Sequence, residues 1–399
     1  MFPVFLASGL FLGWSLGAND AANAYGTAVG SRMVRFRSAA IACGAFVILG
    51  AVVGGAGPSE TLGRLGSVNA PPGAFTVALA AALTVTWMTR LGLPVSTSQA
   101  IVGAIIGWNV FSGSSTDPDS LTEIVGSWVL CPLLAAAFAA LLLRLVQGLL
   151  RAIPLHLFQL DAATRYGLVV VGAFASYSLG ANNIANVMGV FVPSAPLGEL
   201  DVFGLFRLSP GQQLFLIGGI AIAVGVFTYS KRVMLTVGSR LFRLSPLSAL
   251  IVVLAQALVL FLFSSEALQG WLSSRGLPAL PLVPVSSSQA VVGAVLGIGL
   301  AKGGRNIRWG VLGRIASGWV ATPLVSGVMA LLLLFLVQNV FSQRVCEPAH
   351  SPHPTEVADD RERAPEPTFL AGLGDSSTAP PSRPCPWSPR WTPPGDPLR

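Results

Sequence analysis

The chain has 399 residues, of which 53% are apolar and only 10% are charged, with a mean hydropathy of +0.69. A water-soluble protein of this length needs more charge on its surface, so the composition excludes a soluble globular protein and indicates an integral membrane protein. The net charge of +7 does not indicate a nucleic-acid partner, because the basic residues form short clusters between apolar segments, as topology signals do.

Five apolar segments in the first half of the chain are long enough to lie within a bilayer. They span about 2–30, 38–57, 74–91, 94–112 and 122–150. A complete helical crossing takes about 20 residues, which several of these segments reach. The third and fourth segments are separated only by the break at Gly92–Pro94, which favours a hairpin or a pair of half-helices.

The second half contains five further apolar segments, and the end of the chain differs in composition. The segments span about 165–192, 211–230, 245–264, 282–300 and 309–341. Residues 342–399 are rich in proline, serine and charge and have no apolar periodicity, so we expect a disordered tail. The expected division is a first membrane repeat at 1–157, a second at 158–341 and the tail at 342–399.

Three motifs of the first half recur in the same order in the second half. SLGANDAAN at 15–23 recurs as SLGANNIAN at 178–186, and PVSTSQAIVGA at 94–104 recurs as PVSSSQAVVGA at 284–294. The third motif, EIVGSW at 123–128, recurs as RIASGW at 314–319. Chance does not explain three ordered matches, so we interpret the two halves as copies of one unit.

The number of segments in each copy predicts how the copies are related. Each copy has about five embedded segments, or three crossings if the broken pair is re-entrant, and either number is odd. The second copy is therefore expected to be inserted upside down, as in many secondary transporters. The predicted fold is an all-α integral membrane protein with two inverted repeats that contain re-entrant or broken hairpin helices.

Loop charge predicts the orientation of this fold. Basic residues gather in loops on one side, which the positive-inside rule assigns to the cell interior: Arg32, Arg151, Arg165, Lys231 and Lys302. The N- and C-termini are then outside. The expected location is a cell membrane, taken as the inner membrane of a bacterium.

Polar side chains within apolar segments are costly in lipid and indicate functional sites. Asn19, Asp20 and Asn23 form one such group, and Asp20 is the only acidic residue in the middle of an apolar segment. Carboxylate, amide and freed backbone oxygens make a site for sodium, whereas a proton needs Asp20 alone. The second copy lacks the carboxylate, so the two sites should be unequal: Asn182, Asn183 and Asn186. The alternative is a packing motif whose amides bond across helices.

Two hydroxyl-rich runs each follow a proline and open an apolar helix. They are Ser96-Thr97-Ser98-Gln99 and Ser286-Ser287-Ser288-Gln289. A helix N-terminus offers free N–H groups and the positive end of the helix dipole, so the pair predicts an anion site suited to phosphate. The alternative is plain N-capping of two core helices. The two glutamines could donate to the anion or bind a cation, and the sequence does not choose between these roles.

These residues together resemble the inorganic phosphate transporter (PiT) family. The Gly-Ala-Asn-Asp motif, its repeat and the two Pro-Val-Ser-x-Ser-Gln runs match in order over about 1–341, although Asn183 stands where many members carry aspartate. The resemblance implies cation-coupled phosphate uptake, with phosphate held where two hairpin helix N-termini meet. The residues implied around phosphate are Ser96, Thr97, Ser98, Ser286, Ser287 and Ser288.

The same resemblance implies which residues surround the coupling ion. The residues implied around cations or the central site are Asn19, Asp20, Asn23, Gln99, Asn182, Asn183, Asn186 and Gln289. The ligands expected if the ion is sodium are Asp20, Asn23, Gln99, Asn186 and Gln289. A homodimer is compatible with the resemblance.

The predicted function is symport of inorganic phosphate with sodium or a proton, without a further cofactor. One alternative is a sulfate permease of the same fold, because sulfate has a similar size and shape. A second is a passive anion channel, which would not need a buried cation ligand such as Asp20. An enzyme is not predicted, because the three histidines, His156, His350 and His353, lie in loops or in the tail.

Overall fold

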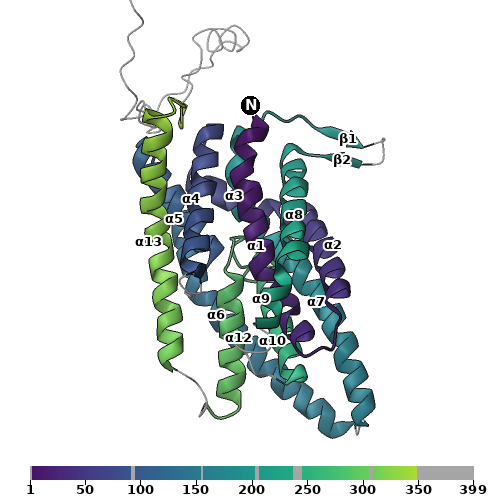
Figure 1. The fold of residues 1–399 in the computed structure, drawn as a ribbon. Helices are drawn as coiled ribbons and strands as arrows, with labels where there is room; N and C mark the ends of the chain where they lie inside the picture. Colours follow the sequence, from purple (N-terminus) through teal and green to yellow (C-terminus); the bar gives the residue numbers. More distant parts are fainter. Residues whose placement is uncertain are drawn as a thin grey trace, which may run out of the picture.

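The computed structural model describes residues 2–90, 95–153, 156–202, 206–236, 245–304 and 309–347. It is built almost entirely of helices, most of which run along one axis of the molecule (Figure 1). Among the described residues, seven helices are long and apolar enough to cross a membrane, and a bent pair raises the number to at most eight. The chain is therefore a multi-pass membrane protein, as its composition predicts.

The helices of the first half are α1 (Phe2–Gly30), α2 (Phe36–Gly54), α3 (Ala56–Leu65), α4 (Pro71–Arg90), α5 (Thr97–Ser112) and α6 (Pro118–Ala152). Those of the second half are α7 (Leu157–Met188), the 3-10 helix η1 (Gly189–Ser194), α8 (Pro210–Thr228), α9 (Ser230–Thr236), α10 (Pro246–Leu262), α11 (Glu266–Ser273), α12 (Ser287–Ala301) and α13 (Trp309–Asn339). Each predicted apolar segment overlaps one of the longer helices.

The structure adds short elements that apolar runs do not reveal. Strands β1 (Leu200–Val202) and β2 (Phe206–Leu208) form an antiparallel hairpin, so the fold is nearly, not entirely, α-helical. Helices α3, α9 and α11 are too short to produce a spanning signal, and α11 is bent by 67° from α10. The break predicted at Gly92–Pro94 lies outside the described residues.

Several helices begin where a capping side chain is followed by proline. Asp117 accepts a hydrogen bond from the Ser120 backbone N–H at 3.0 Å, and Pro118 opens α6. The cap satisfies an otherwise orphaned N–H, and the fixed φ of proline suits the first helical position. The hydrogen bonds from Ser120 also hold the pKa of the Asp117 carboxyl below its ordinary value. Local sequence therefore sets where these helices start.

Close packing between the two halves is reciprocal. Helix α5 packs along α13, and its counterpart in the repeat, α12, packs along α6. Gly103 of α5 lies against the backbone of Pro323, and Gly293 of α12 lies against the backbone of Pro132. Helices α1 and α8, and α2 and α7, form a second reciprocal set. A pseudo-two-fold relation between the copies would produce such pairs, and the inversion of the second copy stays a prediction.

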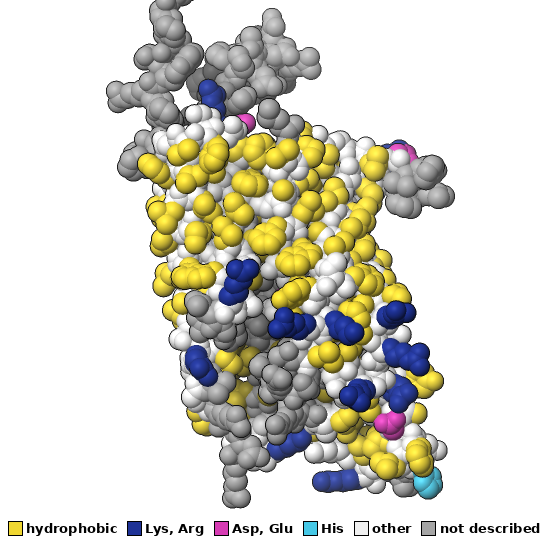
Figure 2. Space-filling view, viewed as in Figure 1, with side chains coloured by type: hydrophobic (Ala, Val, Ile, Leu, Met, Phe, Trp, Pro, Cys, Tyr) yellow, Lys and Arg dark blue, Asp and Glu magenta, His cyan; other side chains and the backbone are white. Residues whose placement is uncertain are grey.

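The two ends of the molecule differ in charge. The N-terminus and the end of α13 lie at the upper end in Figure 1. On the face drawn in Figure 2, lysine and arginine side chains gather in the lower part, and the upper part is predominantly apolar. The start of α1 and the end of α13 therefore lie away from this basic end, and which end faces the cell interior stays a prediction.

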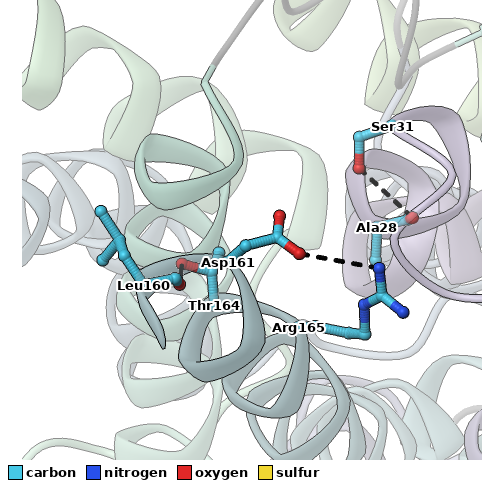
Figure 3. Close-up of polar contacts among 6 residues, drawn as sticks. All are labelled: Ala28, Ser31, Leu160, Asp161, Thr164 and Arg165. Carbon is cyan, nitrogen blue, oxygen red and sulfur yellow. Dashed lines mark hydrogen bonds and ion pairs between the residues drawn. The ribbon is translucent and has the colours of Figure 1, made fainter. Parts of the chain in front are cut away.

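The charge pattern predicted that Arg151, Lys231 and Arg165 lie in loops, but the structure places them on α6, α9 and α7. The clearest case is Arg165. It belongs to α7, where it forms an i,i+4 ion pair with Asp161 at 3.7 Å, near the Ser31 end of α1 (Figure 3). Helix α7 begins at Leu157, so the basic residue is carried on the first turns of a helix that extends beyond the apolar stretch. Both side chains are about half exposed, so this pair contributes little to stability.

The segment after α13 packs against the first half of the chain. Val345 is fully buried, and its carbonyl oxygen accepts a hydrogen bond from Trp108 Nε1 at 3.2 Å. The Asn69 amide pairs with both backbone groups of Glu347, at 3.0 and 2.8 Å. We expected a disordered tail from residue 342, but Val345 and Glu347 are held against the first half of the chain. Residues 348–399 lie outside the described part of the chain.

We predict that Gly103→Ala and Gly293→Ala each lower the thermal stability of the protein. A Cβ at either position collides with helix backbone, which costs about 1–3 kcal/mol in a packed core. Gly126→Ala is the matched control, because nothing lies within 4 Å of that Cβ position. Unfolding midpoints in detergent measure the effect, and Gly103→Ala and Gly126→Ala proteins of equal stability would contradict the packing.

Candidate functional site

Hydrogen bonds join the repeated polar motifs of both halves. The first asparagine motif lies in α1 and the second in the last turns of α7, while the two serine runs open α5 and α12. Ser287 Oγ donates a hydrogen bond to Asp20 Oδ2 at 2.9 Å, which joins α12 to α1 across 267 residues of sequence. Asp20 is 5% exposed and is the only charged side chain buried among the described residues.

The two serine turns are in direct contact. Ser98 Oγ donates to the Val285 carbonyl at 3.1 Å, and Ser288 Oγ donates to the Val95 carbonyl at 3.2 Å. The residues of each pair occupy equivalent places in the two motif copies, so the bonds are reciprocal. The prediction that the two helix N-termini face each other agrees with this contact.

Ser96 and Ser286 serve as N-caps, which was the alternative reading for the serine runs. Their hydroxyl oxygens accept from the backbone N–H of Gln99 and of Gln289, each at 3.3 Å. The N–H groups at the very start of a helix have no intrahelical partner, so those of α5 and α12 remain to bind a ligand. The Thr97 hydroxyl makes no hydrogen bond within the described residues, and Thr97 is 8% exposed.

The first asparagine motif surrounds the Asp20 carboxylate. Asn19 Nδ2 donates to Asp20 Oδ1 at 3.2 Å, and Asn23 Nδ2 donates to Ser287 Oγ at 3.4 Å. Asn19 and Asn23 are both partly exposed. This copy therefore combines a buried carboxylate with two partly exposed asparagines.

The second asparagine motif is fully buried and binds other parts of the site. The Asn182 amide forms two hydrogen bonds with the backbone of Val285, from Nδ2 to the carbonyl at 2.7 Å and to Oδ1 from the N–H at 3.0 Å. Asn186 Nδ2 donates to Ser98 Oγ at 2.9 Å and to Asn183 Oδ1 at 3.0 Å. The second copy thus holds both serine turns in place.

Three amide oxygens of the site have no hydrogen-bond partner among the described residues. They are Gln99 Oε1, Gln289 Oε1 and Asn186 Oδ1, and each belongs to a fully buried or nearly fully buried residue. An unpaired buried acceptor costs about 1–3 kcal/mol, so a cation or a donor ligand would stabilise these groups. No three His, Cys, Asp or Glu residues come together in the described ranges, so the oxygens that the site offers a cation are the Asp20 carboxylate and amide, hydroxyl and carbonyl oxygens.

Sequence reasoning missed the backbone partners of the site. The carbonyls of Val95 and Val285 link the two turns, and the Cys131 thiol also contacts the Ser286 carbonyl at 3.7 Å. The one available signal was that valine precedes the serine run in both copies. Arg90, the basic residue nearest in sequence, ends α4 and is exposed.

Comparison with known proteins gives a consistent relationship. A family model described as the phosphate transporter family matches residues 16–330 and 279–365. A protein named "putative phosphate permease" from Pyrococcus furiosus is 27% identical over 400 residues, which cover 81% of this chain and 92% of that protein. The sulfate permease CysP of Bacillus subtilis is 31% identical over 345 residues, which cover 84% of this chain and 88% of that protein.

One solved structure is similar to this fold. It is described as the sodium-dependent phosphate transporter, and it superposes with a TM-score of 0.65 at 23% sequence identity. The match covers 84% of this chain and 98% of that chain. At this identity the likeness shows a shared fold.

We predict that Ser287→Ala destabilises the protein and that Ser287→Thr does not. Alanine removes the donor to the buried Asp20 carboxylate, at a cost of about 1–3 kcal/mol. Threonine keeps the hydroxyl, and the equivalent position in α5 is already threonine, Thr97. Unfolding midpoints in detergent test this, and an alanine variant as stable as the threonine variant would show that the bond contributes nothing.

Proposed function

Since the chain belongs to the phosphate transporter family, we propose that it carries inorganic phosphate across a membrane in symport with a monovalent cation, either sodium or a proton. The observation that supports this most is the convergence of two hydroxyl-bearing helix starts and one buried carboxylate, joined by the Ser287–Asp20 hydrogen bond. The proposed anion site and the proposed cation site are therefore adjacent, linked by this hydrogen bond.

Phosphate would bind at the facing starts of α5 and α12. Free N–H groups and the positive ends of two helix dipoles favour an anion there. The Thr97 hydroxyl is available to donate to the anion. The hydroxyls of Ser98, Ser287 and Ser288 would have to leave their present acceptors to do so. Ser96 and Ser286 contribute indirectly, because their capping bonds hold the turns in shape.

The coupling cation would bind beside Asp20. Sodium prefers oxygen ligands, and this neighbourhood offers the carboxylate together with three unpaired amide oxygens, from Gln99, Gln289 and Asn186. Asn23 completes the proposed sodium ligands, whereas a coupling proton would use Asp20 alone. Among the described residues, Asp20 is the only buried charge, so the site holds no fixed positive charge and a bound cation would supply the attraction for phosphate. Rocking of one inverted repeat against the other would then expose the site to either side.

Sulfate is the second candidate substrate, because the sulfate permease CysP is 31% identical to this chain. Phosphate at neutral pH carries a proton that it can donate in a hydrogen bond, and sulfate does not. The Asp20 carboxylate and the unpaired amide oxygens are acceptors suited to that proton, which favours phosphate.

Uptake of labelled phosphate into liposomes tests the function. We expect uptake driven by an inward sodium or proton gradient and unaffected by excess unlabelled sulfate. Absence of phosphate uptake, or strong inhibition by sulfate, would move the assignment to a sulfate permease. Uptake that equilibrates phosphate without any dependence on either cation would instead indicate a passive channel.

We predict that Asp20→Asn lowers gradient-driven phosphate uptake by about tenfold or more, because it removes a charged ligand worth about 1.5–3 kcal/mol. Glu123→Gln is the matched control, since Glu123 is an exposed acidic residue of α6 and its loss should leave uptake unchanged. Initial rates at equal protein density give the comparison. An Asp20→Asn protein that transports like the parent would exclude the proposed role of Asp20.

A further inference from the structure

The two copies of the asparagine motif hold their neighbours in different ways. In the second copy, Asn182 uses both ends of its amide to bind the backbone of Val285, at 2.7 and 3.0 Å. In the described structure, the equivalent residue of the first copy, Asn19, makes no such pair with Val95. Its Nδ2 donates to Asp20 Oδ1 at 3.2 Å instead, because the neighbouring carboxylate is a stronger acceptor. The equivalent asparagines of the two copies therefore have different partners, the adjacent carboxylate for Asn19 and the Val285 backbone for Asn182.

Asn183, which replaces the carboxylate in the second copy, is satisfied within its own helix. Its Nδ2 donates to the Leu179 carbonyl at 3.2 Å, and its Oδ1 accepts from Asn186 Nδ2 at 3.0 Å. A carboxylate at this position would set a negative oxygen against the Leu179 carbonyl. The position is therefore matched to an amide, with a donor on one side and an acceptor on the other.

The two motif copies also differ in how far their asparagine side chains are exposed. Asn182 and Asn186 are 0% exposed and Asn183 is 1% exposed, so the whole second motif is sealed. Asn19 and Asn23 of the first motif are partly exposed, on either side of Asp20 in α1. An ion that arrives from water can meet the first motif without any rearrangement of the second.

We propose that the two motif copies have divided roles. The first copy is the charged cation site, Asn182 forms a brace that positions the second serine turn through Val285, and Asn183 orients Asn186 within α7. Asn182 and Asn183 are positioning residues in this arrangement, and they do not bind the coupling ion. Cation dependence then rests on Asp20, the one charged side chain buried among the described residues. This inference deepens the proposed function and rests on it for its uptake readout.

The brace acts through the Val285 carbonyl. That oxygen accepts from Asn182 Nδ2 and from Ser98 Oγ, and the next residue, Ser286, caps α12. Loss of the Asn182 amide frees the turn that presents the α12 N-terminus, so anion binding and transport rate should fall. Asp20, Asn19 and Asn23 lie in α1 and make no hydrogen bond to Asn182 in the described structure, so the cation concentration that gives half-maximal activity should not move.

The test compares variants of the full chain in two assays. The first measures the sodium dependence, and separately the pH dependence, of thermal unfolding of the purified protein without phosphate. The second measures phosphate uptake in liposomes as a function of the driving cation. The variants are Asp20→Asn, Asn182→Ala and Asn183→Leu, with Asn183→Asp added because Asn182→Ala can fail to fold.

We expect Asn183→Leu to keep the half-effective cation concentration of the parent within about twofold in both assays, whereas Asp20→Asn raises it about tenfold or abolishes the response. Asn182→Ala should lower maximal uptake about tenfold at an unchanged half-effective concentration. Asn183→Asp should lower the unfolding midpoint without a steeper cation dependence.

Two results would overturn the division of roles. One is a half-effective cation concentration that shifts about tenfold in Asn183→Leu, as in Asp20→Asn. The other is an Asn183→Asp protein with a steeper cation response than the parent. A parent protein that fails to transport phosphate refutes only the proposed substrate. The unfolding assay needs no phosphate, so it still tests whether Asn182 and Asn183 are positioning residues. A parent whose unfolding ignores both sodium and pH overturns the cation role of the first copy.

Discussion

A bilayer interior holds no water to satisfy polar groups, and the Val285 carbonyl shows how this chain meets that constraint. The carbonyl precedes the cap of α12 and accepts hydrogen bonds from Ser98 of α5 and Asn182 of α7. One backbone oxygen therefore fixes three helices from both halves of the chain. The reciprocal bond from Ser288 to Val95 closes the contact, so the two helix starts are held face to face.

This arrangement depends on packing that brings the helices within hydrogen-bond reach. Helix α5 lies along α13 and α12 along α6, with Gly103 and Gly293 against helix backbone. Association of helices in lipid relies on such small residues, because no hydrophobic effect drives apolar surfaces together there. The glycines therefore set the positions from which the serine turns meet. The buried Asp20 carboxylate is compensated by two donors, the Ser287 hydroxyl of α12 and the Asn19 amide of α1.

Much of this architecture can be predicted from the sequence, because lipid makes polar residues within apolar segments rare and conspicuous. The long helices, the duplicated motifs and the family follow from that contrast. The role of each polar residue does not. Ser96 and Ser286 fit both capping and ligand binding by sequence, and only the bonds from Gln99 and Gln289 identify the caps. The Val285 carbonyl leaves no signal, since every residue has a carbonyl. Arg165 was misplaced because α7 extends beyond its apolar stretch.

The central claim is that an anion and a cation occupy one shared site beside Asp20. Equilibrium binding of labelled phosphate to the purified chain tests it most directly, with sodium replaced stepwise by choline at two pH values. The account predicts that phosphate binds at least about tenfold more tightly when sodium is raised or, for a coupling proton, when the pH is lowered. Equal affinity in sodium and choline at both pH values would contradict it, because a site without fixed positive charge would then hold phosphate unaided.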